Sequence, residues 1–144
     1  MKKFLAIFLV LALAMTAMAG CGGTGGDSGE SADVTKIGFL YIGPVTDGGY
    51  NQAQHAGAMA AQEELGDSVK VLWAENVAED LQAVKTNAIN MIDNGATIII
   101  GTSFGHMDGL AELAEEYPDL TFLHFSGYKM NDTNFGNYFG AMEE

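Results

Sequence analysis

The sequence predicts an α/β fold with a doubly wound, parallel sheet. Short runs of unalternated apolar residues, such as 37–42 and 96–100, are typical of strands buried on both faces. These runs alternate with segments in which apolar residues recur every three or four positions, as in amphipathic helices. Four strands alternating with three helices need right-handed crossovers, and the order 2-1-3-4 places the first and third strands side by side.

The first predicted strand spans 36–42 and leaves through the glycine-rich loop 43–49. The next helix carries small and apolar residues at helical spacing, and we expect this face to pack closely on the sheet. Its members are Ala53, Gly57, Ala60, Ala61 and Leu65. Gly66 is expected to end the helix, because glycine readily adopts the conformation that follows a last helical turn.

The second predicted strand, 69–73, leads to a helix with acidic residues at its start, Glu79 and Asp80. Asn94-Gly95 is a strong stop signal for that helix. The β-branched run 96–100 is the clearest strand in the chain, and its composition favours the middle of a parallel sheet.

The third predicted helix follows the loop 101–108 and is closed by Pro118. Residues 120–125 form the fourth predicted strand, with 126–129 as its exit loop. The stretch from Asn134 to Met142 is either a fifth strand or the start of a connection.

Residues 1–20 are predicted to be a signal peptide, because Lys2 and Lys3 precede an apolar stretch too short to span a membrane comfortably. The following Met18-Ala19-Gly20-Cys21 resembles the lipobox of bacterial lipoproteins, although Leu usually stands where Met18 does. Lipidation of Cys21 would anchor the chain to the cell membrane on its extracytoplasmic face. Alternatively, this lone cysteine is an unpaired thiol beside an ordinary cleavage site. The Gly/Ser-rich stretch 21–35 suits a flexible tether to a domain at 36–144.

The charge of the chain excludes several partners. After residue 20, four lysines face nineteen acids and there is no arginine, so the formal charge of this part is −15. Such a chain repels nucleic acid and anionic headgroups. Phosphate ligands are also disfavoured, because anion sites usually recruit Arg or Lys. The charge therefore favours a neutral or cationic small molecule.

The loop after the first strand is the main candidate for a ligand site, because small molecules bind beyond the carboxyl ends of strands in open α/β sheets. Asp47 either contacts the ligand directly or caps the next helix. The Tyr50 ring can stack on a planar base, and the Asn51 carboxamide can hydrogen-bond to the edge of that base. Alternatively, Tyr50 and Asn51 are ordinary surface residues of the helix.

A second candidate loop follows the central strand. If the strand order is right, Phe104 and Tyr50 flank one ligand; otherwise Phe104 anchors the core. Asp108 either binds a hydroxyl group or starts the next helix. No His or Cys residues stand at the spacing of metal ligands, so we expect no metal, no cofactor and no catalytic residue.

Several ordered blocks of this sequence resemble the basic membrane protein family of ABC-transporter substrate-binding lipoproteins, some of which bind purine nucleosides. The resemblance covers essentially all of 36–142. The blocks are Tyr41-Ile42-Gly43-Pro44-Val45, Asp47-Gly48-Gly49-Tyr50 with Gly57, Glu75-Asn76-Val77, Thr102-Ser103-Phe104-Gly105 with Met107-Asp108, Tyr117-Pro118-Asp119 with Phe122, and Gly127-Tyr128.

The resemblance implies a periplasmic-binding-protein type 1 fold, in which two α/β lobes enclose the ligand. This chain looks like the first lobe alone, either a fragment or a truncated reading frame, so we expect the second lobe to be missing. The implied function is non-enzymatic capture of a nucleoside, nucleobase or similar neutral heterocycle for an ABC transporter permease. Many family members carry an Asp after the fourth strand, where this chain has Ser126-Gly127.

Two other functions stay open. One is a sugar- or signal-binding receptor module that feeds a membrane sensor. The other is an enzyme with a dinucleotide-binding fold, although the loop 43–48 lacks the G-x-G-x-x-G spacing that brings backbone close to a pyrophosphate.

Overall fold

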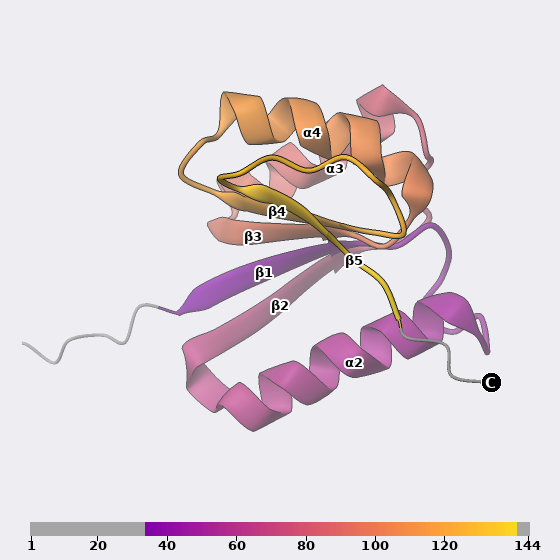
Figure 1. Ribbon diagram of the computed structural model, residues 1–144. Helices are drawn as coiled ribbons and strands as arrows, with labels where there is room; N and C mark the ends of the chain where they lie inside the picture. Colours follow the sequence, from indigo (N-terminus) through magenta and orange to yellow (C-terminus); the bar gives the residue numbers. More distant parts are fainter. Residues whose placement is uncertain (1–33, 141–144) are drawn as a thin grey trace, which may run out of the picture. The chain divides into compact units, whose positions relative to one another are not determined.

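The computed structural model of the protein describes residues 34–140, which belong to one compact unit. Five parallel strands form one sheet in the order β2-β1-β3-β4-β5 (Figure 1). The strands are β1 Thr35–Leu40, β2 Val69–Ala74, β3 Ala96–Gly101, β4 Thr121–Phe125 and β5 Phe135–Tyr138. The longer helices are α2 Tyr50–Leu65, α3 Leu81–Asp93 and α4 Met107–Glu116, and short 3-10 turns cover Gly66–Ser68 and Phe104–His106.

The predicted fold class and the order of the first four strands are confirmed. The stretch after Asn134 forms a fifth strand, which pairs with β4 at the edge of the sheet. Residues 141–144 lie outside the described part of the chain, as do 1–33, which hold Cys21, the predicted signal peptide and most of the predicted tether.

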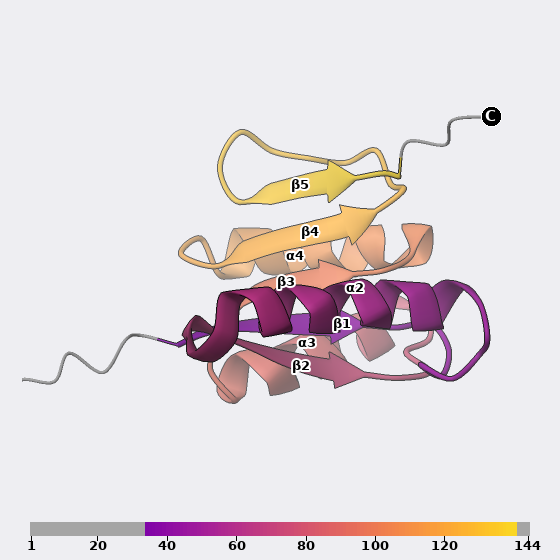
Figure 2. The ribbon, with the colours of Figure 1, turned by 90° about the horizontal axis from the view of Figure 1, so that it is seen from below.

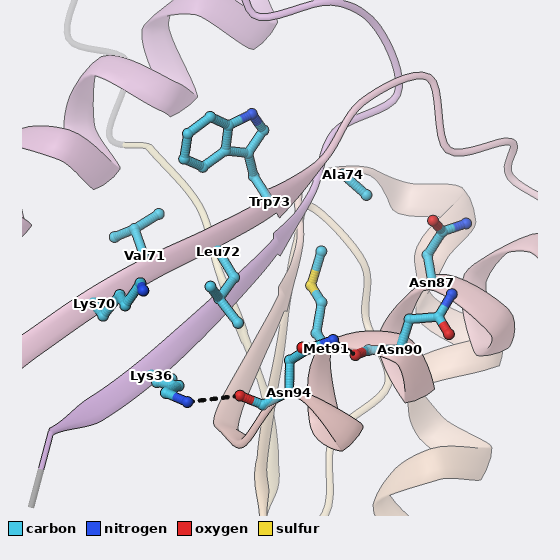
Figure 3. A pocket seen from close by; sticks show the side chains of 10 residues that line it. All are labelled: Lys36, Lys70, Val71, Leu72, Trp73, Ala74, Asn87, Asn90, Met91 and Asn94. Atoms are coloured by element: carbon cyan, nitrogen blue, oxygen red, sulfur yellow. Dashed lines mark hydrogen bonds between the residues drawn. The ribbon is translucent and has the colours of Figure 1, made fainter.

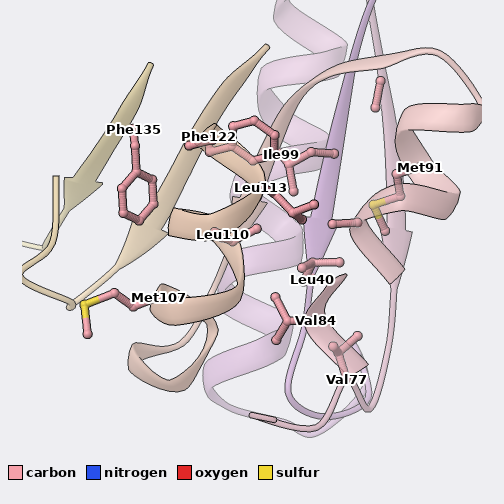
Figure 4. Close-up of a cluster of buried hydrophobic side chains, with 13 residues drawn as sticks. Leu40, Val77, Val84, Met91, Ile99, Met107, Leu110, Leu113, Phe122 and Phe135 are labelled. Atoms are coloured by element: carbon pink, nitrogen blue, oxygen red, sulfur yellow. The ribbon is translucent and has the colours of Figure 1, made fainter. Parts of the chain in front are cut away.

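The main core lies between the sheet and the helices α3 and α4 (Figure 4). Leu40, Ile99 and Phe122 come from three neighbouring strands and are fully buried on this face. Val84 of α3 and Leu110 of α4 pack against them. Each such side chain contributes about 1.5–3 kcal/mol when it leaves water, so this layer holds the sheet together.

Helix α2 lies on the opposite face and is attached to β1 and β2 through polar contacts as well as apolar ones. The Tyr41 hydroxyl and His55 Nδ1 are 3.3 Å apart, and the Val71 N–H donates to Gln62 Oε1 at 2.6 Å. Ala58 is the buried apolar residue of this helix. These contacts fix which side of α2 faces the sheet.

The prediction that the small-residue face of α2 packs closely on the sheet holds only in part, because Ala53, Gly57 and Ala61 face the sheet across a hollow. Ala53, Gly57, Ala60, Ala61 and Leu65 are all exposed. Alanine and glycine recur on more than one side of this helix, so their spacing does not identify the buried side. The side is instead determined by His55 and Gln62, whose partners lie on or directly after the strands.

The expectation that helices cover both faces of the sheet also holds only in part. Seen from the α2 side, the helix lies away from β4 and β5 (Figure 2). Leu123 and Tyr138 line a hollow with residues of α2, the Phe125 ring contacts Tyr50, and all three residues stay partly exposed. Within residues 34–140, this face of β4 and β5 therefore has no helix over it.

Candidate functional site

The exit loops of the strands meet at the carboxyl edge of the sheet. The Tyr41 N–H donates to Ala74 O, and the Thr102 N–H donates to Leu40 O, at 2.9 and 3.1 Å. The Val77 N–H then donates to Tyr41 O at 2.9 Å. These bonds continue the sheet pairing past the strand ends, so the loops start from fixed positions.

Asp47 is an acceptor for the backbone at the start of α2. Its Oδ1 accepts from the N–H groups of Gly49 and Gln52 at 2.8 and 3.0 Å, and its Oδ2 accepts from the Asn51 N–H at 3.0 Å. These bonds hold the pKa of the Asp47 carboxyl well below its usual range. Asp47 therefore accepts from N–H groups of the first turn of α2 although Gly49 is the N-cap residue, and ligand contact by Asp47 stays a prediction.

Asn51 lies behind Asp47 and is only 5% exposed. Its Nδ2 donates to Asp47 Oδ2 at 2.9 Å, and its Oδ1 accepts from the Gly43 N–H at 3.3 Å. A Cβ at Gly43 would lie 2.7 Å from Asn51 Nδ2, so a larger residue there would displace the Asn51 carboxamide. The carboxamide thus fastens the loop to the helix, and a hydrogen bond from Asn51 to a ligand stays a prediction.

Tyr50 lies between the exits of β3 and β4 and is 38% exposed. Its hydroxyl donates to Thr102 O, and its ring meets the edge of Phe125 with centroids 5.8 Å apart. Burial raises the pKa of the Tyr50 hydroxyl. The ring is therefore held at the crevice while part of it stays accessible.

Phe104 is 53% exposed, so the alternative that it anchors the core is wrong. Its ring lies 6.1 Å from that of Tyr128, a residue of the β4 exit loop that the sequence reasoning did not select. Whether Phe104 and Tyr50 flank one ligand stays a prediction.

Asp108 forms an ion pair with Lys129 at 2.7 Å, and both side chains are largely exposed.

Glu79 is a second residue that the sequence reasoning missed at this edge. The Ser103 hydroxyl donates to Glu79 Oε1, and the Gly105 N–H donates to the same atom at 3.2 Å. The Ser103 bond, the Gly105 bond and the nearby His106 lower the pKa of the Glu79 carboxyl. Glu79 therefore ties the loop before α3 to the loop that carries Phe104.

Each of the three histidines contacts another group of the protein: His55 the Tyr41 hydroxyl, His106 the carbonyl of Val77, and His124 the carbonyl of Lys129. His106 is fully buried, its Nδ1 has no hydrogen-bond partner, and burial lowers its pKa.

Residues 34–140 contain no group of three or more His, Cys, Asp or Glu that would hold a metal ion. In the same part of the chain, no helix is both long and apolar enough to cross a membrane.

Four of the hollows in the surface of residues 34–140 show where space is available, and none of these four is lined by Asp47, Asn51 or Phe104. A groove of about 570 Å³ runs between β2 and α3, where Lys36 Nζ donates to Asn94 O at 2.8 Å (Figure 3). Another, of about 470 Å³, lies beside α2 and includes Tyr50. A third, of about 630 Å³, lies between the end of α2 and β2, and a fourth, of about 410 Å³, includes Asp108 and Lys129. Asp47, Asn51 and Phe104 therefore lie outside these four hollows, while Tyr50 and Asp108 each line one of them.

Comparison with known proteins identifies one family and two sequence relatives. Residues 34–144 match the family described as Bmp, ABC transporter substrate-binding protein PnrA-like. The chain is 40% identical over 98 residues to a purine-binding protein of Brucella abortus, an overlap of 67% of this chain and 27% of that protein. It is 32% identical over 108 residues to a Haloferax volcanii protein provisionally assigned as an ABC transporter glucose-binding protein, covering 74% and 26%.

A solved structure supports the fold. An ABC transporter solute-binding protein from Aeropyrum pernix superimposes with a TM-score of 0.61 at 20% identity, over 73% of this chain and 28% of that one. The chain spans about a quarter of the length of the two sequence relatives it matches. Most of each of those longer proteins therefore lies outside the region that matches this chain.

Proposed function

Because this chain belongs to the PnrA-like family of ABC transporter substrate-binding proteins, we propose that it captures a small molecule outside the cytoplasm for an ABC importer. This family consists of binding proteins and not of enzymes. The ligand we propose is a nucleoside, nucleobase or similar neutral heterocycle. The observation that carries this choice is the 40% identity to a purine-binding protein.

The carboxyl edge of the sheet has the chemistry for such a ligand. Tyr50 is held by Thr102 and Phe125 with part of its ring accessible, and Phe104 lies in the exit loop two residues beyond Thr102. An aromatic ring stacks on any base, because every base has a π-face. The strong negative charge and the lack of arginine favour a ligand without phosphate.

An NMR titration of the 144-residue chain tests the ligand class. We expect inosine, guanosine or adenosine at millimolar concentration to shift the amide signals of Tyr50 and Phe104 in a saturable way. The affinity should be low, because a site open on one side buries less of the ligand than an enclosed pocket does. Tyr50→Ala should weaken binding at least about fivefold, as expected for loss of one stacking contact, while Tyr50→Phe keeps most of it.

A control variant at the far end of the same helix is Leu65→Ala, whose side chain is exposed. It should bind as the unchanged protein does. If none of the nucleosides or their free bases causes saturable shifts, the proposed ligand class is wrong.

The second candidate ligand is a sugar, because the other relative is assigned to glucose. Sugar sites also use aromatic rings, so the rings at the edge do not separate the two classes. Glucose as a further arm of the titration decides between them. Saturable shifts with glucose and none with nucleosides would replace the first choice by the second.

We also propose that Cys21 is lipidated and anchors the protein to the extracytoplasmic face of the membrane, near its permease. The support is the sequence Met18-Ala19-Gly20-Cys21 and the Gly/Ser-rich stretch that follows. Feeding a bacterial expression host an alkyne fatty acid should label the protein and leave Cys21→Ser unlabelled. Equal labelling of both forms, or of neither, would contradict the anchor.

A further inference from the structure

Two exposed aromatic rings lie together at the carboxyl edge, one on each of two neighbouring exit loops. Phe104 is 53% exposed and Tyr128 is 69% exposed. Their ring centroids are 6.1 Å apart and their planes are tilted by 51°. Single exposed apolar residues are normal in proteins, but a pair of rings at the edge where α/β sheets bind ligands is a more specific feature.

The backbone that carries Tyr128 is fixed by a buried histidine. His124 Nδ1 accepts from the Gly127 N–H at 3.1 Å, so its Nε2 carries the proton and donates to Lys129 O at 2.7 Å. A Cβ at Gly127 would lie 2.1 Å from the His124 ring, which only glycine avoids. His124 therefore closes the loop on both sides of Tyr128.

Three further contacts hold the same loop. Met107 Sδ accepts from the N–H groups of Tyr128 and Lys129, each at 3.3 Å, and Asn137 Nδ2 donates to Gly127 O at 2.8 Å. Lys129 Nζ is also paired with Asp108. The main chain around Tyr128 is thus anchored at every residue from 127 to 129, while the ring itself stays accessible.

We propose that Tyr128 is a ligand-contacting, specificity-determining residue, and that with Phe104 it forms an aromatic wall on which a planar, uncharged ring system stacks. This proposal rests on the proposed function. A ring whose backbone is already ordered loses little conformational freedom on binding, which makes it an efficient contact. The Asp108–Lys129 pair beside it is electrically balanced, which fits an uncharged ligand.

The test is the NMR titration of the full 144-residue chain with guanosine as the probe. Tyr128→Ala should weaken guanosine binding about five- to 150-fold, the range of one base stacked on one ring. Tyr128→Phe should stay within about twofold, because it keeps the ring. Base protons of guanosine should move upfield with the unchanged protein and with Tyr128→Phe, and less with Tyr128→Ala.

Met130→Ala is the matched control, because Met130 lies on the same loop and is 63% exposed but has no ring. It should leave the guanosine affinity unchanged. If the unchanged protein and Tyr128→Ala bind guanosine equally while Tyr50→Ala binds it weakly, the role of Tyr128 is wrong and the proposed function stands. If guanosine does not bind but another nucleoside or base of the first titration does, that ligand replaces guanosine as the probe. If the unchanged protein binds none of them, both proposals fall.

Discussion

At the scale of single residues, Asp47 and Asn51 form a closed unit that shapes the loop before α2. The carboxylate accepts from three backbone N–H groups, and the carboxamide bonds both to that carboxylate and to Gly43. Both residues were selected from the sequence as ligand contacts. Their hydrogen-bonding capacity is directed largely into the protein, so they define the shape of the site whether or not they touch a ligand.

Asp47→Asn should lower the thermal midpoint at neutral pH, because one charged acceptor at the start of α2 is lost. The lowered pKa of Asp47 means that its stabilising contribution is present above the unfolded value of about 3.9 and is lost as the pH falls below it. The difference between the two proteins, measured by circular dichroism, should therefore shrink in acid. Asp119→Asn, a change of an exposed acid, serves as the control. A difference that is the same at every pH would contradict this assignment.

His106 predicts a second pH effect, near neutrality. Its pKa is lowered by burial, so between that value and about 6.5 the unfolded chain binds a proton that the folded chain does not. Stability should therefore fall as the pH drops below about 6.5. In His106→Leu the free energy of unfolding should depend less steeply on pH. The slope should be smaller by up to about 1.4 kcal/mol per pH unit, the value for one bound proton. Urea unfolding at several pH values measures it, and parallel curves for both proteins would contradict it.

At the scale of helices and strands, two glycines predict opposite effects of the same change. Gly57 lies in the middle of α2, where an added Cβ would have no atom within 4 Å, whereas a Cβ at Gly109 of α4 would lie 2.6 Å from Val84 Cγ1. Gly57→Ala should stabilise the protein by about 0.5–1 kcal/mol through helix propensity. Gly109→Ala should destabilise it by about 1–3 kcal/mol through overpacking between α3 and α4. Urea unfolding measures both changes in stability. If both variants are stabilised or both are destabilised, the packing argument is wrong.

The sequence predicted the strands and helices well, because their signals are local. Asp80 accepts from the Ala83 N–H as a helix cap should, and α3 ends just before Asn94-Gly95. The buried side of α2 was not predictable in this way. It depends on where His55 and Gln62 find partners, and those partners lie at the end of β1 and on β2, away from the helix in the sequence.

In the candidate site, too, residues that follow a strand end could be predicted, whereas residues defined by contacts distant in the sequence could not. Tyr50 and Phe104 were identified because each follows a strand end, a property that the sequence contains. Tyr128 follows β4 in the same way and was available to that reasoning. Glu79 was not, because its partners Ser103 and Gly105 reach it only when the exit loops of two strands meet.

At the scale of the whole molecule, the sheet face that α2 leaves uncovered at β4 and β5 predicts how the chain binds apolar probes. The hollow beside α2 is lined mainly by apolar groups, including Phe39, Ile100 and Leu123. Nile red, an uncharged dye, should bind there and gain fluorescence. Leu123→Glu should remove about half of that gain or more, because it places a charge in the hollow. Met130→Glu, on an exposed loop, should leave it unchanged, and equal losses in both would show that the dye binds elsewhere.

The position of β1 between β2 and β3 also has a consequence for folding kinetics. Gly38 of β1 pairs with Ile99, 61 positions away, whereas Phe122 of β4 pairs with Phe135, only 13 away. Closing the longer loop costs about 1.4 kcal/mol more in chain entropy. In pulse-labelling hydrogen exchange, amides of β4 and β5 should therefore be protected before those of β1. The loop that leaves β1 and carries Asp47, together with Tyr50 at the start of α2, would then reach its final place only late in folding, so a partly folded chain would have no binding edge.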